Sequence, residues 1–82
     1  MSRYFFHLRD GVDYLLDPEG VELAALGAAK AYATRSAYSI MAAELGHGKL
    51  DLSVHIEIVN AEGAVLATVY FRDLVTVTGL AN

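Results

Sequence analysis

The stretch AALGAAKAYATRSAYSIMAAELG, residues 24–46, decides the fold. It is dominated by alanine, the best helix former, contains no proline, and places its internal glycine, Gly27, in the first predicted turn. Gly46 at its end is the type of residue that stops a helix. We therefore predict one long helix that begins at Ala24 or Ala25 and ends at Leu45.

One face of this predicted helix is lined by small and apolar residues, which should pack on a sheet. This stripe comprises Leu26, Ala29, Ala33, Ala37, Ile40 and Glu44, with Met41 on its flank. Alanine in the middle of the stripe would let the helix axis lie close to the sheet. Tyr32 and Tyr38 flank the stripe on opposite sides, where they can cover the sheet edges.

The segment before the helix begins with strand character. Residues 3–9 are rich in aromatic side chains, which favour strands, and the turn sequence Asp10-Gly11 follows them. Tyr4, Phe6 and Leu8 alternate along this segment and share one apolar face. We expect that face to point into the core.

The remaining strands follow from alternation and turn sequences. We predict strands at 12–16, 54–60 and 64–71, a short extended piece at 21–23, and either a short strand or a tail at 74–78. The sequence Asn60-Ala61-Glu62-Gly63 is typical of a hairpin turn. The order β-β-α-β-β, with or without a last strand, predicts a single domain spanning 1–82. Its fold class is α+β, a two-layer sandwich of one helix on an antiparallel sheet.

The composition predicts association with another chain. The chain has 82 residues, of which 55% are hydrophobic and 20% charged, and a core of this size supplies only about 3–5 kcal/mol. Because cysteine is absent, neither a disulfide nor a thiolate zinc site can add to it. We therefore expect a homo-oligomer, most simply a homodimer.

The charge balance predicts which partners are absent. The formal net charge is −4, and the basic residues form no run, whereas nucleic-acid binding depends on a basic patch. No apolar stretch approaches the roughly 20 residues that span a bilayer. We therefore expect no nucleic acid and no membrane as partner, and a cytoplasmic location. A nucleic-acid-associated regulator is the least favoured alternative function.

The second face of the predicted sheet is the candidate interface. It should carry Phe5, Val59, Leu66 and Tyr70, which are too apolar for a face open to water. We expect a homodimer packed sheet on sheet, docking of another protein there, or pairing through an exposed strand edge. The simpler alternative is that Phe5 and Tyr70 cover each other as a cross-strand aromatic pair.

The same face carries the sharpest alternative, a metal or ligand site. His55 and Glu57 are two residues apart on one predicted strand, and His7 should share their face if the two strands are neighbours. A catalytic zinc needs three such ligands and an open position. Polar residues at alternate positions are also what a partly wet sheet face shows, so we assign no metal and no cofactor.

Other reactive side chains give no catalytic motif, and we expect no enzymatic activity. His47 lies between two glycines without an identifiable partner, and Ser36 and Ser39 lack the context of a serine nucleophile. The pairs Arg9-Asp10 and Arg72-Asp73 recur at two strand ends. They can bind an anion together, but ordinary ion pairs at strand ends explain them as well.

Three segments of the chain resemble a known family. RYFFHLRDG at 3–11, DPEGVEL at 17–23 and VYFRD at 69–73 together resemble a family of short, chiefly alphaproteobacterial proteins, a domain of unknown function. The resemblance extends from residue 1 to about 78 and departs at Ala24-Ala25, where a polar or acidic cap is more usual. It implies the two-layer architecture and a bacterial cytosolic setting. It implies no activity, ligand or catalytic residue.

Overall fold

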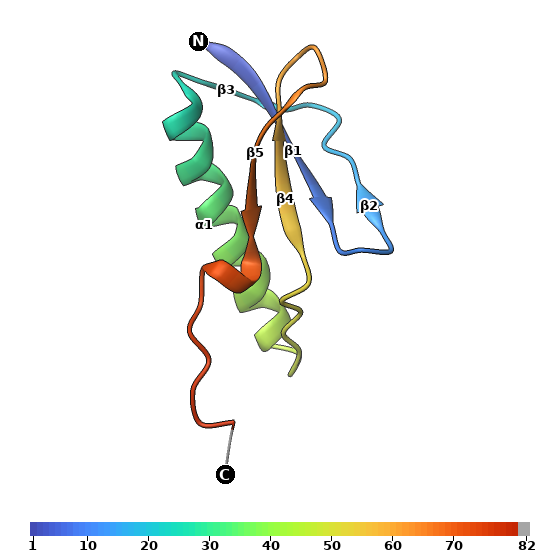
Figure 1. The fold of residues 1–82 in the computed structure, drawn as a ribbon, viewed down its shortest axis with the longest axis vertical. Helices are drawn as coiled ribbons and strands as arrows, with labels where there is room; N and C mark the ends of the chain where they lie inside the picture. The colour runs from blue at the N-terminus through green and yellow to red at the C-terminus, as the bar shows by residue number, and fades with distance from the viewer. Residues whose placement is uncertain (81–82) are drawn as a thin grey trace.

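The computed structural model describes residues 1–80, and it confirms the predicted fold class (Figure 1). One long helix packs on a five-stranded antiparallel sheet. The elements are β1 (Ser2–Arg9), β2 (Tyr14–Leu15), β3 (Val21–Leu23), α1 (Leu26–Leu45), β4 (His55–Val59) and β5 (Val65–Tyr70), followed by a short 3-10 helix (Phe71–Asp73). The order is thus β-β-β-α-β-β, because the extended piece at 21–23 pairs with β1 as a strand of its own.

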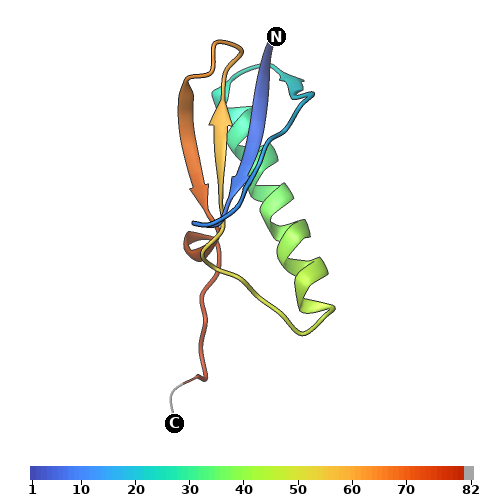
Figure 2. The same cartoon turned by 90° about the vertical axis from the view of Figure 1, so that its right-hand side faces the viewer.

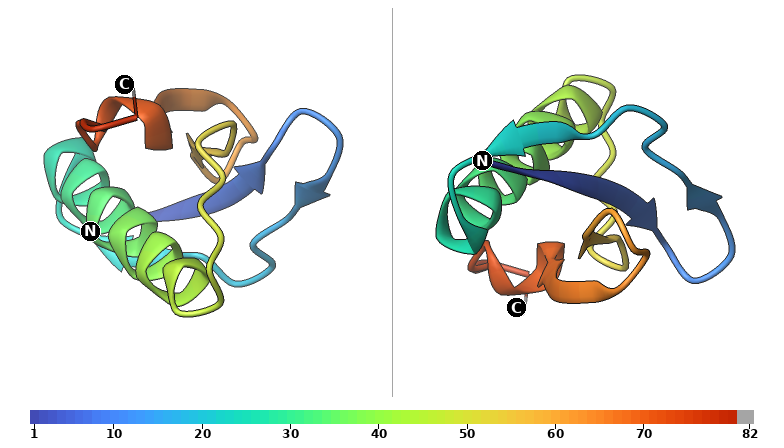
Figure 3. Two further views of the ribbon diagram at one scale, coloured as in Figure 1. Left: turned by 90° about the horizontal axis from the view of Figure 1, so that it is seen from below. Right: turned by 90° about the horizontal axis from the view of Figure 1, so that it is seen from above.

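The sheet runs in the order β2-β1-β4-β5, with β1 and β4 at its centre. The segment that returns from the first turn pairs with β1 twice: β2 pairs with its end, Leu8 opposite Leu15, and β3 with its beginning, Tyr4 opposite Val21. Viewed along its length, the molecule carries β2 at one margin of the sheet and β5 at the other (Figure 3).

Helix α1 covers one face of the sheet and leaves the other open (Figure 2). The predicted small-residue stripe forms the contact, because Ala29, Ala33 and Ala37 are completely buried against the sheet. The expected core face of β1 is confirmed as well, with Tyr4 buried and Phe6 and Leu8 packed against the core. The core comprises Tyr4, Ala29, Ala33, Ala37, Met41, Val54, Ile56, Ile58 and Phe71.

The two ends of α1 differ in how their free backbone hydrogen-bonding groups are capped. At the start, Ala25 gives no side-chain cap, and only its carbonyl accepts a hydrogen bond, from the N–H of Ala29. At the end, Gly46 stays right-handed, with φ −60°, and the chain turns left-handed at Gly48, with φ 75°. The helix thus ends after Leu45 as predicted, but Gly48 supplies the conformation that only glycine adopts easily.

Two tyrosines hold the flanks of α1 in place, as their predicted positions on opposite sides suggest. The ring of Tyr32 lies 4.6 Å, centroid to centroid, from the ring of Phe6 on β1. On the other flank, the hydroxyl of Tyr38 donates a hydrogen bond of 2.8 Å to the carbonyl of Leu74. This bond fastens the start of the C-terminal tail to the helix. Among residues 74–80 no strand forms, so the tail alternative is the correct one.

Candidate functional site

The open face of the sheet carries three cross-strand rows of side chains. Residues opposite each other in the register share a face, which fixes the members of each row. The first row is Tyr14, Arg9, His55 and Tyr70; the second is His7, Glu57 and Thr68; the third is Phe5 with Val59 and the start of β5. The residues predicted for this face that have a partner in the register therefore lie on it, and Leu66 falls outside the register.

Glu57 is the centre of a polar network on this face. Its carboxylate accepts a hydrogen bond from the hydroxyl of Tyr14 at 3.2 Å and lies 3.7 Å from Nε of Arg9. Nε2 of His55 lies 3.8 Å from the same carboxylate. The guanidinium of Arg9 also stacks over the Tyr14 ring at 3.9 Å. Glu57 is mostly buried beneath these neighbours. Its carboxylate, in the middle of the open face, therefore already has polar partners within the chain.

The predicted ligand cluster comes together only in part. His7 lies directly opposite Glu57, and His55 is close to it, so the two strands are neighbours as the hypothesis requires. However, Nδ1 of His7 accepts a hydrogen bond of 3.0 Å from the N–H of Asp17. Within residues 1–80, no group of three or more His, Asp or Glu side chains is arranged to hold a metal ion.

The four residues of the candidate interface do not form one apolar patch. Phe5 and Val59 share the third row, and Val59 is buried, with 6% of its surface exposed. Tyr70 lies in the first row, where its ring contacts His55 at 5.2 Å and the Arg72 guanidinium at 4.6 Å. The alternative of a Phe5–Tyr70 aromatic pair is therefore wrong, because the polar second row separates the two rings.

A bulge changes the expected alternation at the start of β5. Ile58 lies opposite Ala67 while Val59 lies opposite Val65, so Leu66 is the extra residue. Val65 and Leu66 are both exposed, at 55% and 40%, although strict alternation would place Val65 toward the core. Simple alternation could not reveal this shift, because the bulge depends on the pairing of the two strands.

The outer edge of β5 is the open end of the sheet. The N–H of Phe71 donates to the carbonyl of Val54, and hydrogen-bonded pairs alternate along an antiparallel ladder. The backbone groups of Ala67 and Val69 therefore point toward β4, and those of Thr68 and Tyr70 point outward. In the described structure β5 pairs with β4 alone. Residues 64–71 include no charge, proline or glycine.

A groove runs beside this edge on the side of the helix. Its volume is about 260 Å³. It is lined by Ala67, Thr68, Val69 and Tyr70 of β5, by Lys30 and Thr34 of α1, and by Asp73 and Leu74. An added strand at the β5 edge would place its side chains over this groove. The sequence predicts an open strand edge but does not show which strand provides it.

The opposite margin is closed by Asp17. Between β2 and β3 its carboxylate accepts hydrogen bonds from the N–H groups of Phe6, Glu19 and Gly20, at 3.1, 3.2 and 3.1 Å. Partial burial raises the pKa of this carboxyl, but the hydrogen bonds and nearby His7 outweigh it, so the net pKa lies below the ordinary value. Gly20 lies so close to the backbone of β1 that a Cβ added to it would be 2.8 Å from the Tyr4 carbonyl oxygen.

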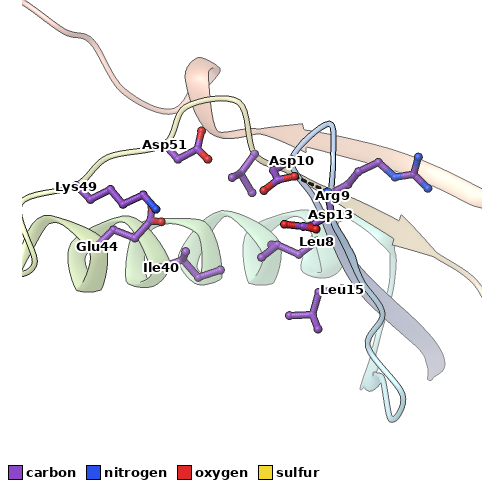
Figure 4. Close-up of a pocket in the computed structure, with 10 residues that line it drawn as sticks. Leu8, Arg9, Asp10, Asp13, Leu15, Ile40, Glu44, Lys49 and Asp51 are labelled. Atoms are coloured by element: carbon purple, nitrogen blue, oxygen red, sulfur yellow. Dashed lines mark hydrogen bonds between the residues drawn. The ribbon is translucent and has the colours of Figure 1, made fainter.

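An acidic cavity lies between the end of α1 and the β1–β2 turn (Figure 4). Its volume is about 190 Å³, with Leu8, Leu15 and Ile40 among its apolar walls. The carboxylates that line it are Asp10, Asp13, Glu44 and Asp51, and Lys49 lies beside Glu44 (Figure 4).

Two of these carboxylates already accept hydrogen bonds from neighbouring residues of the chain. Hydrogen bonds from the N–H groups of Asp13 and Val12 lower the pKa of Asp10, and bonds from Ser53 lower that of Asp51. Oε1 of Glu44 is buried without a hydrogen-bond partner. Arg9 points away from the cavity toward Glu57, so it does not neutralise these acids (Figure 4).

The other reactive residues named from the sequence stay apart. His47 lies exposed in the turn after α1, and Ser36 and Ser39 lie on the helix near Tyr32. Arg9 pairs with Glu57, while Arg72 stacks on Tyr70. In the described part of the chain, the two Arg-Asp dipeptides form no ion pair with each other.

A comparison with protein families identifies the chain. The model of DUF6894, a domain of unknown function, matches residues 3–72. The chain belongs to this family. The match includes β1 from Arg3 onward, the other four strands and α1, so the sheet edges and the open face described above are parts of the DUF6894 domain. Among curated proteins and among solved structures, none matches the chain. Within residues 1–80, no helix has the length and hydrophobicity needed to cross a membrane.

Proposed function

We propose that this DUF6894 chain is a non-enzymatic protein-interaction module that binds its partner by adding a strand at the outer edge of β5. The observation that supports this most is the state of that edge. Thr68 and Tyr70 direct their backbone N–H and C=O groups outward, and among the described residues β5 pairs with β4 alone. Peptides that add to a sheet edge use such groups for affinity.

The composition of β5 favours the same function. Natural sheets protect their edges with charges, prolines or very short strands, and β5 is six residues long and has none of these residues. Strands of this composition pair readily with another chain. A protein that leaves such an edge open in isolation gains from covering it in a complex.

The open face supports this function less well than the edge. Its middle row is a polar network in which Glu57 already has Tyr14, Arg9 and His55 as partners. Its apolar residues are divided between the two ends of the face, with Val59 buried. A partner packed on this face would have to cover the network, at a desolvation cost, in order to reach a small apolar area.

A strand peptide tests the proposal without a known partner. The probe is a fluorescent peptide with the sequence of residues 64–71 and a lysine tag for solubility, and the measurement is its anisotropy on addition of protein at concentrations where the protein is monomeric. We expect saturable binding to the wild type and none to Thr68→Pro, which removes an outward N–H but no bond within the sheet.

Two controls keep this test decisive. Thr68→Lys blocks the same edge without a proline, and Thr76→Lys makes the same change in the exposed tail. A peptide with proline at the position of Thr68 should not bind. Equal binding by wild type and both edge variants, or no binding by the wild type, would contradict strand addition at β5.

A further inference from the structure

The groove beside the β5 edge carries one charge at each of its ends. Its lining includes Lys30 of α1 and Asp73, the last residue of the 3-10 helix, and both residues are exposed. Within residues 1–80, neither of them forms an ion pair. Arg72, which adjoins Asp73, stacks over the ring of Tyr70 at 4.6 Å, on the open face of the sheet. The groove therefore offers a positive and a negative charge to a partner.

The two charges lie at opposite ends of the groove because α1 and β5 run in the same direction (Figures 1 and 2). Lys30 precedes Tyr38 by about two helical turns, a rise of about 12 Å. The hydroxyl of Tyr38 donates to the carbonyl of Leu74, which follows Asp73. Lys30 thus lies toward the start of β5, and Asp73 lies just beyond its end. Because the Debye length is about 8 Å at physiological ionic strength, the two charges do little to neutralise each other.

The middle of the groove is apolar. Ala67 and Val69 line it from β5, and both pack against the core. Thr34 lines it from α1, and its hydroxyl already donates a hydrogen bond of 3.0 Å to the carbonyl of Lys30. A polar side chain placed here would lose water without gaining a free donor, so an apolar side chain fits best.

A strand added at this edge places every second side chain over the groove. Residues opposite Ala67 and Val69 point to the helix side, whereas those opposite Thr68 and Tyr70 point to the open face. Three successive groove-facing side chains span about 13 Å, at about 3.3 Å per residue. This span matches the rise of about 12 Å along α1 that separates the levels of the two charges.

We infer that the partner strand carries a basic, a small apolar and an acidic residue at its three groove-facing positions, in that order from its N-terminus. This inference rests on the proposed function and names the class of its partner. Because every strand pair in the described sheet is antiparallel, the added strand runs against β5 and begins at the Asp73 end. Its basic residue then meets Asp73, and its acidic residue meets Lys30.

Two peptides of identical composition test this order. Their sequences are TKTVTET and TETVTKT, with blocked ends and a fluorophore, and the measurement is the anisotropy of each on addition of the full chain. We expect TKTVTET to bind about three- to tenfold tighter, because two exposed ion pairs replace two like-charge contacts. Raising the salt concentration to about 1 M should remove the difference, since the contacts are exposed to water.

Exchange of the two charges in the protein should reverse the preference. The double variant Lys30→Glu with Asp73→Lys keeps the net charge, and it should bind TETVTKT more tightly by a similar factor. Arg35→Glu is the control, because Arg35 is an exposed residue of the same helix that lies outside the groove. This variant should keep the preference of the wild type.

The outcomes separate this inference from the proposed function. Equal affinity for the two peptides, a wild-type preference for TETVTKT, or a preference that the double variant does not reverse would overturn the charge order. Absence of binding by both, while the uncharged 64–71 peptide binds, would also overturn it. The proposed function stands in each of these cases as long as the 64–71 peptide binds and the edge variants abolish that binding. If none of the three peptides binds, both are overturned.

Discussion

The two margins of the sheet differ in how they treat the unpaired backbone groups of an edge strand. On the margin beside β1, the return segment forms only the short strands β2 and β3, and Asp17 fills the gap between them. This segment contains proline and several acids, which prevent pairing with another chain. On the margin of β5, six uncharged residues leave their backbone groups open.

The open edge of β5 is therefore not a general property of the fold. The chain carries the residues that protect an edge and uses them on one side only. An edge that is closed by a specific carboxylate beside an edge left without protection favours a binding role for the second.

The largest effect should come from Phe71, which anchors the end of β5 in the core and is completely buried. Phe71→Ala should cost about 3–5 kcal/mol of unfolding free energy because it leaves a large cavity. In a domain this small, most of the chain would then unfold, and the β5 edge would be lost with it. Circular dichroism during urea unfolding measures this. Tyr70→Ala is the control, since the neighbouring side chain lies on the open face; an equal loss for both would contradict this assignment.

The closed margin should be sensitive to Gly20. Gly20→Ala combines a positive φ of 70° with a Cβ 2.8 Å from the Tyr4 carbonyl oxygen, so we expect a loss of about 2–5 kcal/mol. Gly11→Ala is the matched control. Gly11 has a positive φ of 99° but open space around it, and about 1–2 kcal/mol should be lost. Thermal unfolding measures the loss of stability in each variant. Equal losses would show that the close contact between Gly20 and β1 does not contribute to the effect.

Asp17 should contribute next. Asp17→Ala removes the acceptor of three backbone N–H groups, and we expect a loss of about 1–3 kcal/mol in unfolding free energy. Glu19→Ala, two residues further along the chain, removes an exposed carboxylate and should change the free energy by less than about 0.5 kcal/mol. If Asp17→Ala also increased self-association, that would show directly that this carboxylate protects the edge. Equal effects of the two variants would contradict its role.

The contribution of Asp17 should depend on pH in a known direction. Its folded-state pKa lies below the unfolded value of about 3.9, so the stabilisation is fully present above that value and is lost as the pH falls through the folded pKa. The difference in unfolding free energy between wild type and Asp17→Ala should therefore be constant near neutral pH and shrink below about pH 4. A difference that grows on acidification would have the wrong sign for this account.

The smallest effect is expected at Tyr38, whose hydroxyl holds the tail to α1 through the Leu74 carbonyl. Tyr38→Phe removes one exposed hydrogen bond and should cost about 0.5–1 kcal/mol. The tail would then be free to lie near the β5 edge and compete with a partner there. Urea unfolding and light scattering together check this. An unchanged unfolding free energy would show that the bond contributes nothing.

Much of the fold could be predicted from local sequence. The alanine-rich stretch that ends at Leu45 forms the helix, and the alternation of Tyr4, Phe6 and Leu8 sets the core face of β1. These elements depend on propensity and periodicity, which neighbouring residues determine. The left-handed Gly48 and the 3-10 helix after Tyr70 depend on how the chain packs, so local sequence did not reveal them.

The candidate site was harder to predict because it depends on pairing. His7, His55 and Glu57 do share a face, as strand periodicity indicates. The roles of Asp17 and of the Leu66 bulge require knowing which strands are neighbours and in what register, and a single sequence does not contain that directly. For the same reason, composition predicted an association but could not choose between the sheet face and a strand edge.

Amide hydrogen exchange, measured residue by residue with NMR at low and high protein concentration, tests the contrast between the two margins most directly. We expect the Phe6 N–H, which donates a hydrogen bond to Asp17, to exchange slowly at both concentrations. We expect the N–H groups of Thr68 and Tyr70 to exchange rapidly in the dilute protein and to slow down as the concentration rises. Rapid exchange of Phe6, or exchange at β5 that is already slow in the dilute protein or unaffected by concentration, would contradict this contrast.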